Sequence, residues 1–416
     1  MSFNIKFLNL KRKRKKYLTF SLYAEPKSKK ATKNKSEIQQ VIIEKLKDRN
    51  WEGLKGKVAI EITVFTGHRN PPRIEKYVKN IVDIMHKRKL LMNKVDESSL
   101  PFKDDRCIKY LRAKYVFLEG KPQVLVKIRP FSSFISDIHF VHTELGLKHQ
   151  SEPNANSNWN DYNDFLDNRE MYLKILSEEA YDSMVKLKTL DVQKEICDAM
   201  SITPHVVGLL YPKQSKYVND FKQTYRNWAS MLLDVPIRIH LPGIPLKKAE
   251  EEDYKTKYKE DIKSRMRQYL ATHPIFKQLQ SPILVTAFYM PPRKKKKDYK
   301  DIDNIMLEYI MPAMNEVFRP PVSLFNIGMD DHDDNDFNRR AGSIPKSLNG
   351  SAIGYEIMEL PYDFSETDTG FIIVGFKIET TESSVTDYID KEIDQYMTKN
   401  QYIEAFAKVI KIREIL

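Results

Sequence analysis

The apolar positions of the chain form short segments whose spacing switches between that of a strand and that of a helix. Segments with a period of two and many β-branched residues predict strands, and segments with apolar residues three and four apart predict helices. The first third of the chain predicts a strand, a helix, a strand, a helix and a two-stranded hairpin, at 17–22, 36–46, 58–64, 74–91 and 109–128.

The same order of elements returns later in the chain. A strand, a helix, a strand, a helix and a final pair of strands are predicted at 235–241, 254–270, 283–290, 301–314, 352–360 and 371–378. In each copy a Pro-Pro pair, Pro71-Pro72 or Pro291-Pro292, follows the second strand. Because both the order and these breaks match, we predict an internal duplication. Pro312 is expected to kink the helix that contains it.

The two copies and the segments around them predict an α+β chain with four parts. These are a first sheet-and-helix unit with a basic N-terminal segment, a helical insert, a second sheet-and-helix unit and a C-terminal helix, at 1–130, 131–234, 235–382 and 383–416. An Asn-rich stretch at 151–163 is expected to be a loop. Residues 151–200 hold 11 acidic and 5 basic side chains, so the insert is either a spacer between the units or a partner-binding segment.

The net charge of +12 favours a polyanionic partner, and this charge is concentrated at one end of the chain. Residues 1–57 carry 17 basic and 5 acidic side chains, which leaves the remainder neutral. A run of six consecutive cations there is either part of a solvated tail or an arm that binds nucleic-acid phosphates with salt-sensitive affinity. Its members are Lys11, Arg12, Lys13, Arg14, Lys15 and Lys16.

Cysteine content and hydropathy limit the environment in which the chain works. Cys107 and Cys197 are far apart and lack Cys-x-x-Cys spacing, so neither a zinc site nor a disulfide framework is expected. The N-terminal charge is not followed by the apolar core of a signal peptide, and no stretch approaches about 18 apolar residues. These features favour the cytoplasm and no membrane span, and the Lys-, Asn- and Ile-rich composition favours a bacterial source.

The main candidate for chemistry is Asp301-Ile302-Asp303-Asn304, which opens a predicted helix. Alternate residues at such a junction can point the same way, so Asp301 and Asp303 are expected to converge while Ile302 enters the core. Two carboxylates suit Mg²⁺, with Mn²⁺ as a substitute, because both ions prefer hard oxygen ligands. The plainer alternative is that both aspartates only favour the start of a helix, where the dipole attracts negative charge.

Further charged residues lie close to this motif in the sequence. Asp330 and Asp331 begin a run of acids that is either a solvated loop or the source of a third metal ligand, with Asp331 as the catalytic candidate. Five cations before the motif either form a solvated turn or meet a phosphate backbone that enters the site. They are Arg293, Lys294, Lys295, Lys296 and Lys297.

This pattern resembles the RusA-like Holliday-junction resolvases. That family carries Asp-x-Asp-Asn at the start of a helix, a lysine four residues after the second aspartate, and a downstream Asp-Asp before a strand. In the second unit Asp301, Asp303 and Asn304 match, Asp330-Asp331 is the downstream pair, and Leu307 replaces the lysine. The family's members are small homodimers that bind four-way DNA junctions and nick paired strands with Mg²⁺, using three aspartates per subunit.

The first unit matches the same pattern differently. Glu75 falls at the second aspartate, Lys79 at the lysine and Asp104-Asp105 at the downstream pair, whereas Arg73 replaces the first aspartate. An arginine at that place would repel a metal ion, so these residues are expected to form a diverged pseudo-site. The plainer reading of Glu75 and Lys79, one helical turn apart, is a surface ion pair.

The resemblance implies a Mg²⁺-dependent endonuclease that hydrolyses phosphodiester bonds in branched DNA, in recombination or repair. The two units would then form an intrachain pseudo-dimer, as a monomer or in a higher oligomer, with one intact site in the second unit. Two alternatives stay open. One is a nucleic-acid-binding protein on a decayed nuclease scaffold, and the other is an interaction protein that acts through the insert.

Overall fold

The computed structural model describes the regular elements of the chain and the short connections between them. The described residues are 5–15, 17–23, 32–47, 53–66, 71–86, 100–117, 122–145, 157–199, 239–243, 245, 252–291, 299–318, 352–360, 370–378 and 385–415. No helix within these ranges is long and apolar enough to cross a membrane.

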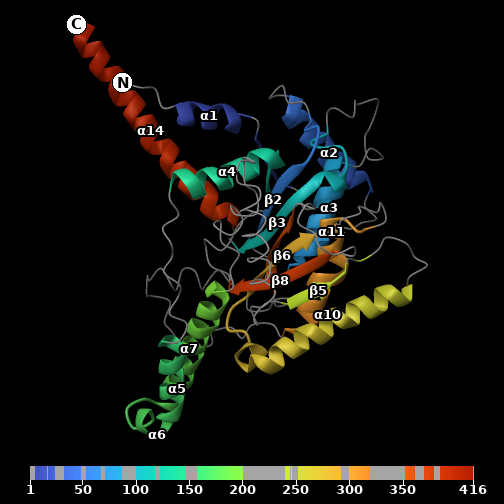
Figure 1. Ribbon diagram of the computed structural model, residues 1–416, viewed down its shortest axis with the longest axis vertical. Coiled ribbons are helices and arrows are strands. Elements are labelled where there is room, and N and C mark those ends of the chain that lie inside the picture. Colours follow the sequence, from blue (N-terminus) through green and yellow to red (C-terminus); the bar gives the residue numbers. More distant parts are fainter. Residues whose placement is uncertain are drawn as a thin grey trace, which may run out of the picture.

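One mixed sheet of eight strands runs through both parts of the chain, in the order β1-β4-β2-β3-β7-β6-β8-β5 (Figure 1). Two neighbouring pairs, β2·β3 and β6·β7, are parallel, and the others are antiparallel. The strands are β1 (Leu18–Leu22), β2 (Val58–Thr66), β3 (Ile108–Phe117), β4 (Gln123–Pro130), β5 (Ile239–Pro242), β6 (Ile283–Met290), β7 (Ala352–Glu359) and β8 (Phe371–Ile378). The predicted α+β class is therefore confirmed.

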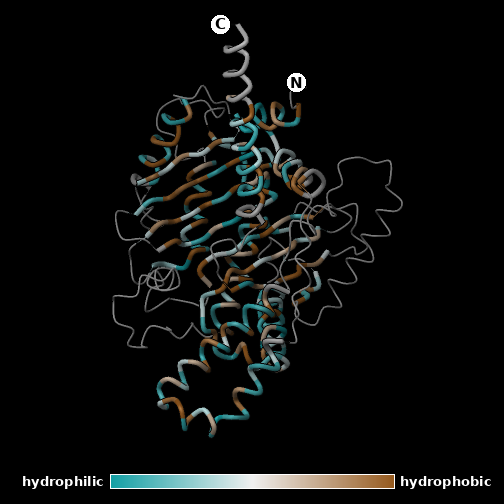
Figure 2. The backbone as a smooth tube through the Cα atoms, turned by 90° about the vertical axis from the view of Figure 1, so that its left-hand side faces the viewer, coloured by the Kyte–Doolittle hydropathy of each residue, from teal (hydrophilic) through white to brown (hydrophobic). Residues whose placement is uncertain are grey.

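Helices cover both faces of the sheet, so the central strands are buried on both sides (Figures 1 and 2). One face carries α2 (Thr32–Lys47), α3 (Ile74–His86), α10 (Glu252–Thr272), α11 (Ile302–Ile305) and α12 (Met311–Val317). The opposite face carries α1 (Ile5–Arg14), α4 (Phe131–Glu144) and α14 (Val385–Ile415). Two separate apolar cores result, one beneath each layer of helices.

The predicted hairpin at 109–128 is wrong, although both of its strands exist. β3 and β4 do not pair with each other, because β2 lies between them, parallel to β3 and antiparallel to β4. In the second half β6 lies between β7 and β8 in the same way. The physical reason is burial: the side chains of β2 and β6 are almost all buried, so each takes a central position with a partner on both edges.

Two other predicted elements differ in detail. Helix α5 (Ser157–Asp167) begins within the stretch that was expected to be a loop. The helix predicted at 301–314 consists of α11, a π-helical turn η7 (Met306–Ile310) and α12. Pro312 stands at the start of α12, where its missing N–H and its ring disfavour a regular α-helical bond to the preceding turn.

The register of the central strands relates the two halves of the sheet by a pseudo-two-fold axis. Tyr110 and Gly354 hold equivalent places, since each pairs with the second residue of the parallel neighbour, β2 or β6. Across β3·β7, Tyr110 pairs with Met358 and Gly354 pairs with Lys114, each four residues further along. The axis therefore passes between Arg112 and Glu356, which face each other at the centre of the sheet.

Gly354 allows β3 and β7 to meet closely, and its replacement by alanine is expected to destabilise the protein by about 2 kcal/mol. An added Cβ would lie 2.6 Å from the backbone oxygen of Ala113, which cannot move without disturbing the strand. Chemical denaturation measures this change. Gly375→Ala is the matched control, because its Cβ would lie 3.3 Å from a side-chain atom of Thr286. An equal cost for both variants would contradict the close central pairing.

The middle of the chain forms a helical hairpin that projects from one end of the molecule (Figures 1 and 2). It consists of α5, α6 (Arg169–Tyr172) and α7 (Glu178–Ala199). Gln193 fixes its base, because its Nε2 donates to the carbonyls of Ile275 and Gln278 at 2.7 and 2.8 Å. Helix α4 instead packs on the sheet directly after β4, as α14 follows β8, so structurally it belongs with the first half.

Candidate metal centre

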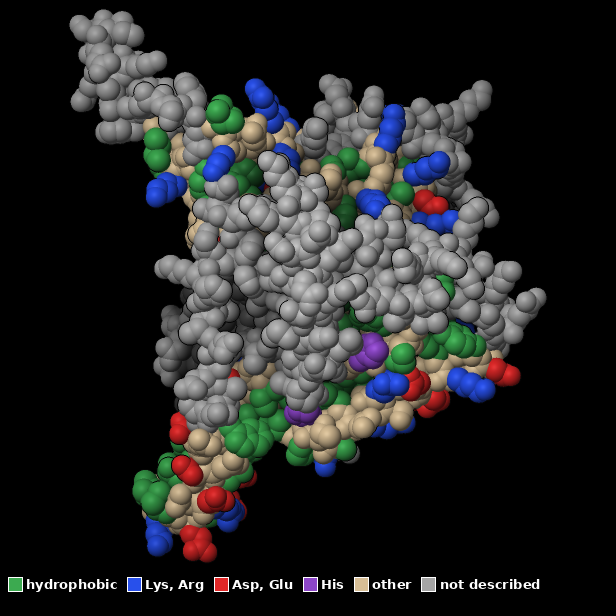
Figure 3. All heavy atoms as spheres, viewed as in Figure 1, with side chains coloured by type: hydrophobic (Ala, Val, Ile, Leu, Met, Phe, Trp, Pro, Cys, Tyr) green, Lys and Arg blue, Asp and Glu red, His purple; other side chains and the backbone are tan. Residues whose placement is uncertain are grey.

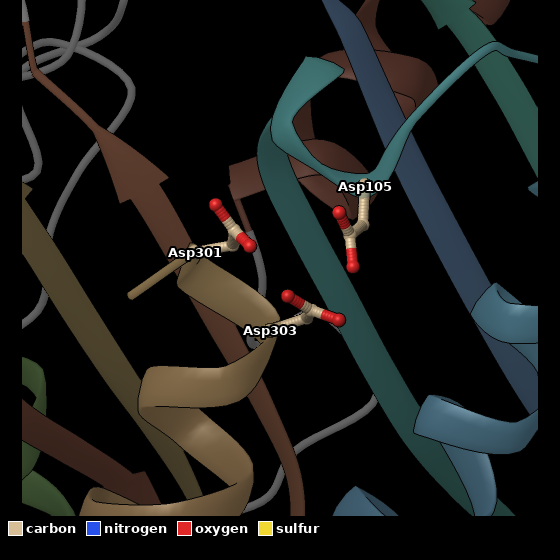
Figure 4. A group of neighbouring side chains, drawn as sticks. All are labelled: Asp105, Asp301 and Asp303. Atoms are coloured by element: carbon tan, nitrogen blue, oxygen red, sulfur yellow. The ribbon is translucent and has the colours of Figure 1, made fainter. Parts of the chain in front are cut away.

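Three carboxylates converge at one end of the central strands of the sheet: Asp105, Asp301 and Asp303 (Figure 4). One oxygen from each lies within 4.8 Å of the others. Asp105 precedes β3 in a single 3-10 turn, η3 (Asp105–Cys107), whereas the other two stand at the start of α11, after β6. The group therefore combines one side chain from the first half with two from the second.

The strand directions explain why residues so distant in sequence meet. β3 runs antiparallel to β7, and β7 runs parallel to β6. The start of β3 and the end of β6 therefore lie at the same end of the sheet. Asp105 enters from the first of these and Asp301 from the second, so the site depends on the β3·β7 pairing.

The local geometry of the second-half motif agrees with the sequence prediction. Asp301 has extended backbone angles, φ −76° and ψ 157°, immediately before α11. Ile302 is 2% exposed and enters the core, while Asp301 and Asp303 turn towards Asp105 (Figure 4). The side chain of Asp301 makes no capping hydrogen bond to the helix. Asp301 therefore does not cap the helix by a side-chain hydrogen bond, and a favourable interaction with the helix dipole stays open as the plainer alternative.

Lys79 of α3 supplies a cation to the cluster. Its Nζ lies 2.7 Å from Oδ2 of Asp303, 3.4 Å from Asp105 and 3.5 Å from Asp83. Burial alone would lower the pKa of Lys79, but the charge and hydrogen bond of Asp303, followed by Asp83 and Asp105, raise it above its ordinary value. The ammonium group therefore stays charged.

Among the described residues, the carboxylates of the cluster outnumber the one cation within 4.0 Å of them. Burial, a hydrogen bond with Asp104 and the charge of Asp303 raise the pKa of Asp105 to about 6. Oδ1 of Asp303 is buried and has no hydrogen-bond partner among the described residues, although the side chain is almost fully enclosed. An unpartnered buried oxygen beside two further carboxylates fits a hard divalent cation such as Mg²⁺ or Mn²⁺.

The residues of the predicted pseudo-site of the first half therefore lie in two different places. Lys79 and Asp105 join Asp301 and Asp303, whereas Arg73 and Glu75 precede and begin α3 at the opposite end of the central strand pair. Asp104 lies beside the cluster and accepts a hydrogen bond from the Arg106 backbone at 3.0 Å. The predicted surface ion pair of Glu75 with Lys79 does not form, because the ammonium group contacts three aspartates instead.

The sequence contained a signal for this exchange that the prediction missed. The lysine absent at Leu307 is present at Lys79, and the aspartate absent at Arg73 is present at Asp301. The two halves are thus complementary rather than independently damaged. Asp83, one helical turn after Lys79, was not singled out and contacts its ammonium group.

Several predicted site residues lie outside the described residues. These are Lys16, Arg293, Lys294, Lys295, Lys296, Lys297, Asp330 and Asp331. The candidates for a third ligand, Asp105 in the first half and Asp330 or Asp331 in the second, differ in their distance along the sequence from the strand that follows them. Asp105 stands three residues before the first residue of β3, whereas Asp330 and Asp331 stand more than twenty residues before β7.

Part of the basic run makes contacts within the molecule. It forms the end of α1, where Lys13 lies 2.9 Å from Asp137 and Arg14 pairs with Asp394. Asp137 of α4 also contacts the buried Arg129, which pairs with Asp390 of α14. Phosphate binding by the run stays a prediction for its other described members, Lys11, Arg12 and Lys15.

The projecting hairpin combines acidic and apolar side chains at its tip (Figure 3). Met171 and Ile175 are 48% and 76% exposed, which is unusual for such large apolar residues. Asp167 and Glu170 lie in the same turn. Because of this composition, both predictions for the insert stay open: a segment that binds a partner and a spacer between the two units.

Comparisons with protein-family models and with curated proteins find no match for this chain.

Proposed function

We propose that this chain is a divalent-metal-dependent endonuclease for branched DNA, built as two RusA-like units that form an intrachain pseudo-dimer. The observation that supports it is the carboxylate cluster of Asp105, Asp301 and Asp303 beside Lys79. This is the acid and lysine set of the resembled family, assembled from both halves. Mg²⁺ is the proposed ion, Mn²⁺ its substitute and the bacterial cytoplasm the proposed compartment.

Each group has a task in phosphodiester hydrolysis. The three carboxylates hold the ion, which supplies charge to stabilise the leaving oxygen and to activate water. Lys79 holds Asp303 in place through Oδ2, which leaves Oδ1 available as a ligand. Its retained positive charge also favours the approach of a phosphate to a site that is otherwise strongly negative.

The chain offers one complete set of these groups. The counterparts of Asp301, Asp303 and Lys79 in the other half are Arg73, Glu75 and Leu307. A chain with one complete set makes one incision per binding event, whereas a homodimer with two equal sites cuts paired strands. We therefore propose a nicking enzyme rather than a symmetric resolvase.

A supercoiled plasmid that extrudes a cruciform tests this proposal. With Mg²⁺ the expected product is the nicked circle, and chelation of the metal abolishes it. Linear plasmid formed in one binding event would contradict the single site. A fixed four-way junction, a flap and a linear duplex, tested in parallel, rank the preferred structures.

The same assay distinguishes the alternatives. Binding of the junction in chelator without incision in Mg²⁺ or Mn²⁺ would support a decayed nuclease scaffold. Absence of DNA binding altogether would leave an interaction protein that acts through the hairpin tip. Either result would overturn the nuclease proposal.

A further inference from the structure

A second position in the molecule corresponds to the carboxylate cluster through the pseudo-two-fold axis. Asp301 and Asp303 precede and begin α11, after β6. In the first half the same places, after β2 and at the start of α3, hold Arg73 and Glu75. β2 runs parallel to β3, which is antiparallel to β7, so this position lies at the opposite end of the central strand pair.

The charged side chains at this position differ from those of the carboxylate cluster. Helix α3 brings Lys79 and Asp83 to the carboxylate cluster. The corresponding residues of the second half, Leu307 and Met311, are apolar and carry no charge to the counterpart. The carboxylate cluster thus has a counterpart at which an arginine, Arg73, stands in place of an aspartate.

Arg73 is held in a fixed place. The hydroxyl of Tyr115 donates to the carbonyl of Pro72 at 2.8 Å, which anchors the segment before the helix. The backbone N–H groups of Lys76 and Tyr77 donate to the carbonyl of Arg73 at 3.1 and 3.3 Å. The residue therefore stands at the N-terminus of a 13-residue helix, where the dipole favours an anion.

Within the described part of the chain the Arg73 guanidinium has no hydrogen bond or ion pair. Glu75, whose charge interacts with Arg73, is 1% exposed, and its two carboxyl oxygens lack hydrogen-bond partners among the described residues. Burial raises the pKa of Glu75 despite the charge of Arg73, so this acid compensates the guanidinium poorly. A half-buried guanidinium on an anchored backbone, with no hydrogen bond or ion pair among the described residues, suits a ligand with phosphate oxygens.

We propose that Arg73 binds a DNA backbone phosphate at this counterpart position, so that the first half holds the strand that the second half does not cut. This inference rests on the proposed nuclease function. The guanidinium takes the place of the metal ion as the positive group that meets the phosphate. No bond is broken there, because Arg73 stands in place of the first of the two aspartates that hold the ion in the second half.

Salt-dependent binding of a labelled four-way junction, measured in chelator, tests the role of Arg73. Arg73→Gln is expected to weaken binding about 10-fold at low salt and to lower the slope of log affinity against log salt by about one. Lys76→Gln removes an exposed cation of the same helix as a control and should change both quantities less.

Unchanged affinity and slope in Arg73→Gln, with normal incision by the wild type, would overturn this inference and leave the nuclease intact. Equal losses in Arg73→Gln and Lys76→Gln would overturn it too, because only general charge would then matter. Failure of the wild type to bind or cut DNA would overturn the proposed function and this inference together. Circular dichroism of each variant checks that the fold is retained.

Discussion

Asp303→Asn is expected to lower the rate of Mg²⁺-dependent incision by about 10³-fold or more. Asp303 is 2% exposed, shares its Oδ2 with Lys79 and leaves Oδ1 without a hydrogen bond. Asparagine keeps the shape of the side chain but removes the charge that a hard cation requires. Single-turnover nicking of a cruciform plasmid measures the loss.

Stability separates this effect from a folding defect. Asp303→Asn also removes one of the carboxylates that repel each other, so the metal-free variant should unfold at a temperature equal to or above that of the wild type. Added Mn²⁺ should raise the unfolding temperature of the wild type but not of the variant. Glu316→Gln, at a 52% exposed side chain on α12, should behave as the wild type in both assays. Wild-type incision by Asp303→Asn would remove the residue from the proposed mechanism.

Lys79→Met is expected to reduce both stability and incision. The ammonium group is the cation within 4.0 Å of Asp303, Asp105 and Asp83, and its side chain is 12% exposed. Its loss leaves buried carboxylates uncompensated, which should cost about 3 kcal/mol in metal-free protein. Incision should fall about 10²-fold, because the positive group facing the phosphate is lost.

Divalent ions distinguish this variant from a general destabilisation. Mn²⁺ should restore much of the lost stability in Lys79→Met, since the ion replaces the missing positive charge. Lys263→Met is the matched control: it breaks pairs with Glu260 and Glu316, which are 58% and 52% exposed. That change should cost less than about 1 kcal/mol and should not respond to metal. Equal costs for the two lysines, or no recovery with Mn²⁺, would contradict the role given to Lys79.

Local features of the fold could be predicted from the sequence. The runs of apolar and β-branched residues placed β6 and β8 at the residues where the structure has them. The neighbours of each strand could not be predicted in this way, because apolar alternation specifies the face of a strand but not its partner. For that reason β3 and β4 were predicted as a hairpin, while the continuously buried β2 in fact separates them.

The candidate site, too, could be predicted from the sequence only where it depends on local geometry. The convergence of Asp301 and Asp303 follows from local geometry at the start of α11, and the sequence prediction included it. The addition of Asp105 and Lys79 depends on the pairing of β3 with β7, strands more than two hundred residues apart. Local periodicity does not contain such a pairing. The complementary losses at Arg73 and Leu307 were the available hint.

Mn²⁺ binding by the full chain tests most directly whether one metal site is assembled from both halves. Titration followed by electron paramagnetic resonance compares the wild type with Asp105→Asn from the first half and Asp331→Asn from the second. The account predicts binding at least about 10-fold weaker in Asp105→Asn and unchanged binding in Asp331→Asn. Unchanged binding in Asp105→Asn, with binding lost in Asp331→Asn, would place the whole site in the second half and contradict the account.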